Sequence, residues 1–390
     1  MKRILIIEDD KLVGNIYRTK FAAEGFAVEL AGDGEGGLAA LKKAKPDLVL
    51  LDLMLPKVSG VEIIKQIRAN AQMRAVPVVV LSNSYLGSVI QDAWKAGANK
   101  CLSKADCTPR QLTEMVRDLL REGEPAGKAA KPSAPASAPV SEADSDAAFQ
   151  ADLRRTFADS APGVISILRK QLAGVTKGAP EARRAGMTEL FARVRSFAGN
   201  AAVAGVTPVA RMASALEALL KELSEKPESL NPSTLRTVAQ AVDTLADLLK
   251  HPVEPLMVPP AILVLDDEVI SRRAVVYALE KAGLKCLSME DPMAALAMLS
   301  ENRFDLVFLD VDMPGMTGFD LCKKLRALPG HEKTPVVFVT SLSDFESRAK
   351  SALSGGNDLI AKPFIFMELA VKALIYLARR QPRPAGDGPN

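Results

Sequence analysis

Two stretches decide the fold: residues 4–10 read ILIIEDD, and residues 262–268 read ILVLDDE. In each stretch, four apolar residues run directly into a cluster of acidic side chains. A short apolar run without polar alternation is typical of a parallel strand that is buried on both faces of a sheet. The double occurrence of this pattern indicates an internal repeat.

The chain repeats itself at a constant offset of 258 residues, with no gap across about 100 residues. The aligned pairs are Asp9 and Asp267, Gly25 and Gly283, Asp47 and Asp305, Asp52 and Asp310, Pro56 and Pro314, Gly60 and Gly318, Pro77 and Pro335, Gly97 and Gly355, Asn99 and Asn357, and Lys104 and Lys362. So many identical residues at one constant offset are not expected by chance. We therefore expect residues 1–122 and 261–380 to be two copies of one domain, called below the first copy and the second copy.

Each copy alternates short apolar runs with longer amphipathic stretches. In the first copy the expected strands are 4–7, 27–30, 48–51, 78–81 and 100–102, and the expected helices include 12–24, 35–44, 60–69 and 85–96. This alternation predicts a doubly wound α/β domain with a five-stranded parallel sheet in each copy. Such sheets bind their ligands beyond the carboxyl ends of the strands.

The residues at these strand ends form the same set in both copies: acidic residues after the first and third strands, a hydroxyl after the fourth and a lysine after the fifth. They are Glu8, Asp9, Asp52, Ser82 and Lys104 in the first copy, and Asp266, Asp267, Asp310, Thr340 and Lys362 in the second. Three carboxylates at one sheet edge repel one another unless a cation neutralises them, and oxygen ligands favour Mg²⁺. A lysine and a hydroxyl suit phosphoryl oxygens. The pattern predicts a Mg²⁺-assisted phosphoryl site with a carboxylate nucleophile.

Both copies resemble the receiver domain of bacterial two-component response regulators, which has a flavodoxin-like or CheY-like fold. The matching motifs are ILIIEDD, LLDLMLPKVSG, VVVLSNS and KCLSKAD in the first copy, and ILVLDDE, FLDVDMPGMTG, VVFVTSL and LIAKPF in the second. The resemblance implies that Asp52 and Asp310 accept a phosphoryl group from a phosphohistidine. It further implies the backbone carbonyls of Met54 and Asp312 as additional Mg²⁺ ligands, Lys104 and Lys362 as partners of the phosphoryl oxygens, and Ser82 and Thr340 as hydroxyls that follow the phosphoryl group.

The two copies differ in how well they match this family. Receivers usually have a cis Lys–Pro bond after the fifth strand, and the second copy has Pro363 there, whereas the first copy has Ala105. A cis bond before alanine costs about 2.5–4 kcal/mol, so we expect a trans bond and a differently shaped loop in the first copy. Asn83 stands where the family prefers a small residue, which would narrow access to Asp52. The second copy is thus expected to be the more orthodox acceptor.

Neither copy has the aromatic residue that the family usually carries three positions before the lysine. Cys101 occupies this position in the first copy and Leu359 in the second. We therefore do not expect either copy to use the family's switch, in which an aromatic ring at this position rotates inward.

The middle of the chain predicts a helical domain between two linkers. Residues 123–146 are rich in Ala, Pro and Ser, and residues 251–260 contain four prolines, so both are expected to be extended linkers. Residues 147–250 show four stretches of helical periodicity, which predict an all-α four-helix bundle. Residues 381–390 are expected to form a disordered tail.

The segment 195–205, RSFAGNAAVAG, resembles the core motif of histidine-phosphotransfer (HPt) domains. Gly199 and Gly205 match that motif, but Arg195 stands at the phosphohistidine and Ala198 at the usual lysine. Arginine stays protonated and forms no phosphohistidine, so this HPt-like domain is degenerate and cannot relay phosphoryl groups. Its helical face could still dock receivers, with Arg193 and Arg195 offering positive charge. A generic four-helix spacer is the alternative.

Composition narrows the class of partner. The 50 Lys and Arg residues nearly balance 47 Asp and Glu, giving a net charge of +3, which argues against nucleic acid as a partner. A basic face on the bundle, made by Arg183, Arg184, Arg193, Arg195 and Arg211, is the alternative, and few aromatic residues are interleaved with it. Four cysteines are too few for a disulfide scaffold, and no apolar run reaches the roughly 18 residues of a membrane span. A cytoplasmic location is expected.

The sequence as a whole predicts a Mg²⁺-dependent phosphoacceptor signalling protein rather than a turnover enzyme. Its upstream partner would be a histidine kinase or a phosphotransfer protein, and its downstream partner an unidentified signalling protein. No DNA-binding or catalytic output domain is expected. The alternative is a constitutive scaffold or adaptor in which one receiver, the first rather than the second, is a pseudo-receiver.

Overall fold

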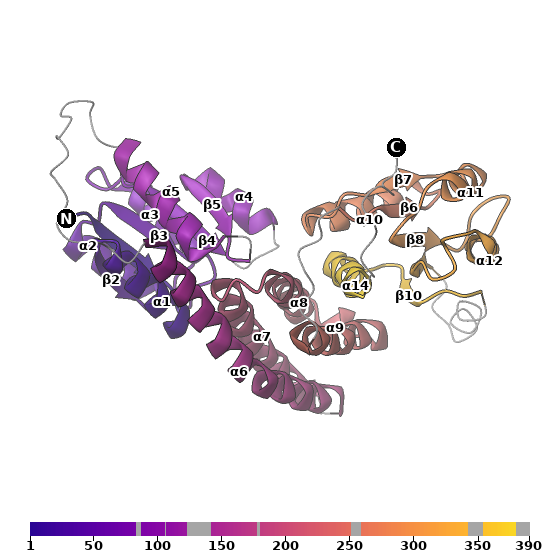
Figure 1. Ribbon diagram of the computed structural model, residues 1–390, viewed down its shortest axis with the longest axis horizontal. Helices are drawn as coiled ribbons and strands as arrows, with labels where there is room; N and C mark the ends of the chain where they lie inside the picture. Colours follow the sequence, from indigo (N-terminus) through magenta and orange to yellow (C-terminus); the bar gives the residue numbers. More distant parts are fainter. Residues whose placement is uncertain are drawn as a thin grey trace. The chain divides into compact units, whose positions relative to one another are not determined.

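The computed structural model describes residues 1–82, 87–105, 107–122, 142–177, 180–250, 259–341 and 354–379. The chain divides into two compact units. The first unit comprises Met1–Val164 and Arg193–Ser214, and the second comprises Ile165–Ala192 and Ala215–Asn390. Each unit holds one α/β domain together with part of a helical region (Figure 1).

The first copy has five parallel strands in the order β2-β1-β3-β4-β5. The strands are β1 (Arg3–Ile7), β2 (Ala27–Ala31), β3 (Leu48–Leu51), β4 (Val78–Ser82) and β5 (Lys100–Ser103). The helices are α1 (Lys11–Ala23), α2 (Gly34–Ala44), α3 (Gly60–Ala69), α4 (Gly87–Ala96) and α5 (Pro109–Glu122). Parallel neighbours in this order need a crossover between strands, and the helices provide it.

The second copy has the equivalent order, β7-β6-β8-β9-β10, and its strands are again parallel. The strands are β6 (Ile262–Leu265), β7 (Leu287–Met289), β8 (Leu306–Asp310), β9 (Val336–Thr340) and β10 (Asp358–Ala361). The described helices are α10 (Val269–Lys281), α11 (Pro292–Glu301), α12 (Gly318–Ala327) and α14 (Phe366–Ala378). The predicted fold class, a doubly wound five-stranded parallel sheet occurring twice, is confirmed.

Both faces of each sheet are buried, which explains the near-continuous apolar strands. In β1, Leu5 and Ile7 pack in one apolar cluster with residues of α2, α3 and α4. Ile4 and Ile6 point to the opposite face and pack with residues of α1 and α5. Because successive side chains of a strand alternate between faces, both sets must be apolar to fill two separate cores.

Two aligned glycines allow a helix to begin directly against the strand that ends in the central aspartate. A Cβ atom on Gly60 would lie 2.4 Å from the backbone oxygen of Asp52, and one on Gly318 would lie 2.1 Å from that of Asp310. Any other residue would push helix α3 or α12 away from the strand end. These glycines thus hold the loop after each aspartate close to the sheet.

The middle region consists of four helices: α6 (Glu142–Lys177), α7 (Pro180–Val203), α8 (Thr207–Glu225) and α9 (Pro232–Lys250), with a short 3₁₀ turn at Pro227–Ser229. Within the first unit, the rings of Phe157 and Phe197 join α6 to α7 at a centroid distance of 5.3 Å. Within the second unit, Arg169 and Asp243 join α6 to α9 at 2.7 Å. The region is consistent with the predicted helical bundle.

Several expected boundaries shift. Helix α6 begins at Glu142, so residues 142–146, expected in the first linker, are helical. Residues 123–141, 251–258 and 380–390, which cover most of both expected linkers and the tail, lie outside the described residues, as does Asn83.

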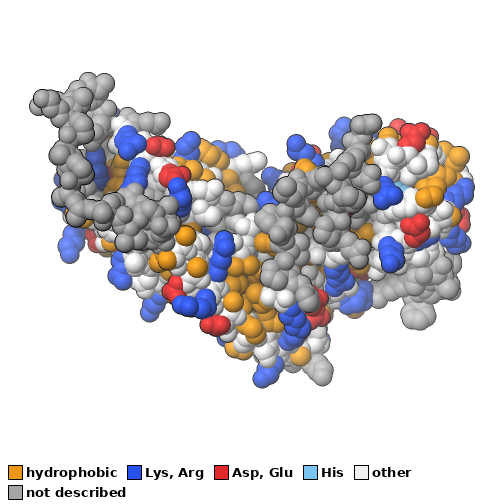
Figure 2. All heavy atoms as spheres, viewed as in Figure 1, with side chains coloured by type: hydrophobic (Ala, Val, Ile, Leu, Met, Phe, Trp, Pro, Cys, Tyr) orange, Lys and Arg blue, Asp and Glu red, His pale blue; other side chains and the backbone are white. Residues whose placement is uncertain are grey.

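Lys and Arg side chains are interspersed with Asp and Glu over the surface seen in Figure 2, in keeping with the small net charge. Among the described residues, none of the helices is both long and apolar enough to cross a membrane.

Candidate functional site

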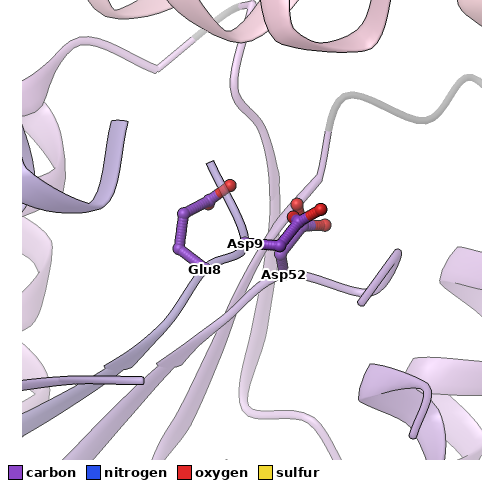
Figure 3. A group of neighbouring side chains, drawn as sticks. All are labelled: Glu8, Asp9 and Asp52. Atoms are coloured by element: carbon purple, nitrogen blue, oxygen red, sulfur yellow. The ribbon is translucent and has the colours of Figure 1, made fainter. Parts of the chain in front are cut away.

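Three carboxylates of the first copy meet at the carboxyl edge of its sheet. Glu8 and Asp9 follow β1, and Asp52 follows the neighbouring strand β3, which pairs with β1 in parallel. Each offers an oxygen within 4.8 Å of the others. Figure 3 shows the three side chains directed toward the same space. The structure thus brings together the acidic residues that the sequence predicts at this edge.

Lys104 joins this cluster from the end of β5. Its Nζ lies 2.6 Å from Glu8 Oε2 and 2.9 Å from Asp52 Oδ2, and all three side chains are buried. Burial alone would lower the pKa of the Lys104 ammonium, but the Asp52 and Glu8 carboxylates raise it well above its ordinary value. Burial raises the pKa of Glu8, and Lys104 offsets only part of this effect. The lysine is therefore a fixed positive charge within the cluster.

Asp52 has a second cationic neighbour, which comes from the helical region. The Nη2 atom of Arg195, in α7, lies 3.0 Å from Asp52 Oδ2 and 2.8 Å from Asp9 Oδ1. The backbone N–H of Met54 donates to Asp52 Oδ1 over 3.1 Å. Burial would raise the pKa of Asp52, but Lys104 and Arg195 outweigh it and hold that pKa below its ordinary value.

The second copy assembles the equivalent set. Oxygens of Asp266, Asp267 and Asp310 lie within 4.8 Å of one another, at the ends of β6 and β8. Lys362 Nζ lies 2.9 Å from Asp266 Oδ2 and 3.3 Å from Asp310 Oδ1. Burial and the Asp266 carboxylate raise the pKa of Asp310 to about 6, although Lys362 acts to lower it. Asp310 thus has a pKa shift opposite to that of Asp52.

The hydroxyl residues lie beside the lysines. Ser82 ends β4 and Thr340 ends β9, and both are buried. The backbone N–H of Lys104 donates to the Ser82 carbonyl, and that of Lys362 donates to the Thr340 carbonyl. Pairing of the fourth and fifth strands therefore places hydroxyl and lysine at the same edge of each sheet, as the sequence predicts.

The residues after each central aspartate differ in their contacts. Asp310 Oδ1 accepts a hydrogen bond from the N–H of Val311, the next residue, whereas Asp52 Oδ1 accepts from Met54. The Asp312 carboxylate accepts a bond of 3.4 Å from the hydroxyl of Ser341. The Lys362–Pro363 bond is cis, as predicted, and the Lys104–Ala105 bond is not.

The chemistry of these residues fits a magnesium ion. Both clusters consist of carboxylate oxygens close enough to share one ion, and such hard donors suit Mg²⁺ better than softer metals. When bound, the ion would neutralise the carboxylates and hold phosphoryl oxygens beside the acceptor. Glu8, Asp9 and Asp52 could hold it in the first copy, and Asp266, Asp267 and Asp310 in the second.

The carboxylates, hydroxyls and lysines that the sequence predicts lie at these two sheet edges, but the sequence does not predict the contribution of α7 to the first. Arg195 was recognised only as a charge that could help to dock a receiver. Asp10 was not singled out, yet its Oδ2 accepts a 2.6 Å hydrogen bond from the hydroxyl of Ser196. The arginine at the phosphohistidine position, Arg195, is the sequence feature that could have suggested a contact between α7 and the acidic site.

The histidines play no part in the described site. Both ring nitrogens of the buried His331 have structural partners, the hydroxyl of Thr334 at 3.0 Å and the carbonyl of Asn302 at 2.9 Å. His251 lies outside the described residues.

A doubly wound sheet that carries acidic residues, a hydroxyl and a lysine at its carboxyl edge defines the receiver class of phosphoacceptor domains. The model of the response regulator receiver domain family matches residues 4–117 and 262–374, which make up more than half of the chain. The chain therefore belongs to this family, and it carries two receiver domains. Receiver domains are phosphoacceptors of two-component signalling rather than turnover enzymes.

Individual relatives match single receiver-sized segments. Protein RcaC of Microchaete diplosiphon is 34% identical over 140 residues, which are 36% of this chain and 21% of that protein. The transcriptional regulatory protein QseB of Haemophilus influenzae is 49% identical over 117 residues, which are 30% of this chain and 50% of QseB. The chain thus spans about half or less of the length of these relatives. The chemotaxis protein CheY4 of Vibrio cholerae matches at 31% identity, covering 30% of this chain and 97% of its own, with a TM-score of 0.29.

Proposed function

We propose that this protein accepts phosphoryl groups from a phosphohistidine in a Mg²⁺-dependent reaction at Asp310, and at Asp52 when the first copy is accessible. The phosphohistidine would be carried by a histidine kinase or a phosphotransfer protein. In the transfer, an oxygen of the aspartate carboxylate forms a bond to phosphorus while the phosphorus–nitrogen bond breaks, and the histidine leaves as neutral imidazole after taking up a proton.

The observation that carries this proposal is the arrangement around Asp310. The acceptor carboxylate lies beside two further acidic side chains and one ammonium group, Lys362, which contacts Asp266 and Asp310. The acids supply a place for a divalent ion, and the ammonium supplies a charge-assisted donor for a phosphoryl oxygen. Thr340 is buried and is the last residue of β9, the strand next to β8. Its hydroxyl would move toward the phosphoryl group once Asp310 is phosphorylated.

We assign the domains as follows: receivers at 1–122 and 261–380, and between them an HPt-like helical domain at about 142–250 that lacks the phosphohistidine. Arg195 at the position of that histidine supports a domain that contacts a receiver without transferring phosphate. The downstream partner would be a signalling protein that recognises the phosphorylated state. No nucleic acid is required for this role.

One observation favours the second candidate function, a scaffold whose first receiver is a pseudo-receiver. Asp52 contacts two cations, Lys104 and Arg195, which compete with a metal ion for its carboxylate oxygens. In this case only Asp310 would accept phosphate, and the first copy would bind a partner protein without being phosphorylated.

The test is phosphorylation of the full chain with acetyl phosphate or a histidine kinase, with Mg²⁺ or with EDTA. Wild type, Asp52→Ala, Asp310→Ala and the double variant are compared by intact mass. We expect Mg²⁺-dependent labelling that Asp310→Ala largely removes and the double variant lacks. Undiminished labelling of the double variant would rule out both acceptors. Loss on Asp52→Ala alone would favour the first copy instead.

A further inference from the structure

The C-terminal half of helix α7 contacts the acidic site of the first copy. Arg195 Nη2 contacts Asp9 and Asp52 at 2.8 and 3.0 Å, and the adjacent Ser196 hydroxyl contacts Asp10 at 2.6 Å. Two consecutive residues of one helix therefore contact three acidic residues of the receiver. All of these residues belong to the same compact unit of the chain.

Apolar packing supports the same contact. Val203, at the end of α7, is buried in the apolar cluster that contains Tyr17 of α1 and Val116 of α5. Leu153 of α6 packs against this cluster. The α1–α5 face of the first copy thus shares a core with the ends of two bundle helices, and the arginine lies at the polar side of a larger interface.

The end of α7 is fixed to α6 by hydrogen bonds to the carbonyl groups of its last residue and of the residue after it. Gln150 Nε2 donates to the carbonyl of Val203 over 3.0 Å, and Arg154 Nε donates to that of Ala204 over 3.3 Å. Carbonyls at a helix end lack partners within the helix, so these bonds hold the two helices in register. The contact between α6 and α7 therefore fixes the backbone position from which Arg195 reaches the acidic residues.

The charges of the two copies differ because of this arginine. In the first copy, three carboxylates are paired with two cations, Lys104 and Arg195. In the described part of the second copy, three carboxylates are paired with Lys362 alone. The second cluster therefore keeps a formal charge of −2, which a divalent ion matches, whereas the first keeps only −1.

The guanidinium and a metal ion compete for the same oxygens. Mg²⁺ binds carboxylate oxygens at about 2.0–2.1 Å and prefers a near-octahedral set of ligands. Arg195 Nη2 lies within 3.0 Å of one oxygen each on Asp9 and Asp52, two of the three carboxylates that would ligate the ion. An ion bound to these two oxygens would clash with the guanidinium, so only one of the two cations can be present.

We propose that Arg195 is a built-in cation that occupies the Mg²⁺ position of the first copy, so that the helical region is an intramolecular partner of that receiver and closes its phosphorylation site. Ser196 and the α1–α5 face provide the rest of the docking surface. The first copy accepts Mg²⁺ and phosphate only when α7 leaves it, whereas among the described residues no second cation contacts the carboxylate cluster of the second copy. This inference rests on the proposed function, since it assumes that the carboxylate clusters are metal sites.

Mg²⁺ binding to the full chain tests this proposal independently of phosphorylation. With Asp310→Asn removing the second site, the first site is titrated by isothermal calorimetry with and without Arg195→Ala. We expect Arg195→Ala to increase the Mg²⁺ affinity of the first site at least about fivefold, since a charge-assisted competitor is lost. Adding Asp52→Asn should abolish the gained binding. Arg169→Ala, which removes an exposed arginine of α6 that pairs with Asp243, is the matched control.

A second measurement uses Trp94, the single tryptophan, which is half-exposed in α4 of the first copy. Its emission on addition of Mg²⁺ and beryllofluoride, a phosphoryl mimic, reports on the first copy alone. We expect a response in Arg195→Ala and Arg195→Gln that is absent from wild type. The circular dichroism spectrum and Mg²⁺ binding by the second copy show that these variants are folded.

A change in Mg²⁺ affinity of less than about fivefold on Arg195→Ala would overturn the proposal, as would tight Mg²⁺ binding by the first site of the chain with Arg195 intact. Failure of the underlying function is recognised separately. In the Asp52→Asn variant only the second copy can bind Mg²⁺, and absence of binding there would contradict the proposed function. The role of Arg195 is decided separately, by Mg²⁺ titration of the first copy in the Asp310→Asn chain.

Discussion

Asp52 and Asp310 occupy the same position in two copies of one domain, yet their carboxyl groups have different cationic neighbours. Asp52 contacts Lys104 and Arg195, and its pKa is lowered, whereas Asp310 contacts Lys362, and its pKa is raised to about 6. Burial acts in the same direction on both groups. The Asp266 carboxylate adds to the effect of burial on Asp310, whereas Lys104 and Arg195 outweigh burial at Asp52, and Arg195 comes from outside the receiver.

The buried lysine of the first copy gives a prediction about stability. Lys104→Met leaves Glu8 and Asp52 buried without their shared ammonium, and breaking a buried pair in this way costs about 3–5 kcal/mol. We expect the urea midpoint of the first copy, followed by Trp94 emission, to fall strongly. Lys65→Met is the control, because Lys65 is exposed and its pair with Glu62 is 3.7 Å long, so it should change stability by less than about 1 kcal/mol. Equal effects of the two substitutions would contradict this assignment.

The close approach of Gly318 to the acceptor strand gives a second prediction. A Cβ there would meet the backbone oxygen of Asp310, so Gly318→Ala forces the start of α12 away and should destabilise the second copy by about 1–3 kcal/mol. Gly174→Ala, on an exposed position of α6 with open space around it, should instead stabilise by about 0.5–1 kcal/mol. Calorimetric unfolding of both variants checks the opposite signs.

Most of the fold could be predicted from the sequence because the repeat and the strand pattern are local. Apolar runs such as Ile4–Ile7, each followed by acidic residues, determine both the strands and the edge where Asp9 and Asp52 meet. The constant offset of 258 residues then gives the equivalent strand and site residue in the second copy. Lysines and hydroxyls were located correctly for the same reason, since each directly follows or ends a strand.

The contact of Arg195 with Asp9 and Asp52 could not be predicted, because it depends on the tertiary placement of α7. Helical periodicity shows which face of a helix is apolar but not which receiver the helix end contacts. The start of α6 at Glu142 was missed for a different reason. Linker-like composition continues across this boundary, so composition alone does not mark where the helix begins.

A third prediction concerns pH and the contact of α14 with α9. Glu368 Oε1 accepts hydrogen bonds from Ser233 and Thr237, and the side chain is buried. Burial raises the pKa of Glu368 above its ordinary value of 4.5, although Lys372 and the two hydroxyls act to lower it. The folded protein therefore binds this proton more tightly than the unfolded chain, so its contribution to stability is full below 4.5 and declines as pH rises through the folded pKa.

Glu368→Gln removes this titration while keeping an oxygen that can accept the hydroxyl hydrogen bonds. Relative to wild type, the variant should become more stable as pH is raised from 4.5 to 7. Thermal unfolding at both pH values measures the difference. Glu301→Gln, at an exposed position of α11, should show no such trend. A stability difference between Glu368→Gln and wild type that is independent of pH would contradict the expected linkage.

The last prediction separates the docking of α7 from the charge of Arg195. The Ser196 hydroxyl donates to Asp10 Oδ2, while Asp10 Oδ1 caps helix α1 by accepting from the N–H groups of Leu12 and Val13. Ser196→Ala removes one charge-assisted hydrogen bond, worth about 1.5–3 kcal/mol, without altering the guanidinium or the cap. If docking of α7 closes the metal site, Ser196→Ala should raise the Mg²⁺ affinity of the first copy in the same direction as Arg195→Ala, but by less.

The double variant Ser196→Ala with Arg195→Ala then measures whether the two residues act through one contact. Two residues of a single interface are expected to be coupled, so the combined gain in Mg²⁺ affinity should be smaller than the product of the separate gains, because undocking by either substitution already opens the site. Calorimetric titration in the Asp310→Asn chain provides all four affinities. Independent, multiplicative effects would mean that Ser196 acts apart from Arg195, and an unchanged affinity on Ser196→Ala would show that the arginine alone holds α7 against the acidic site.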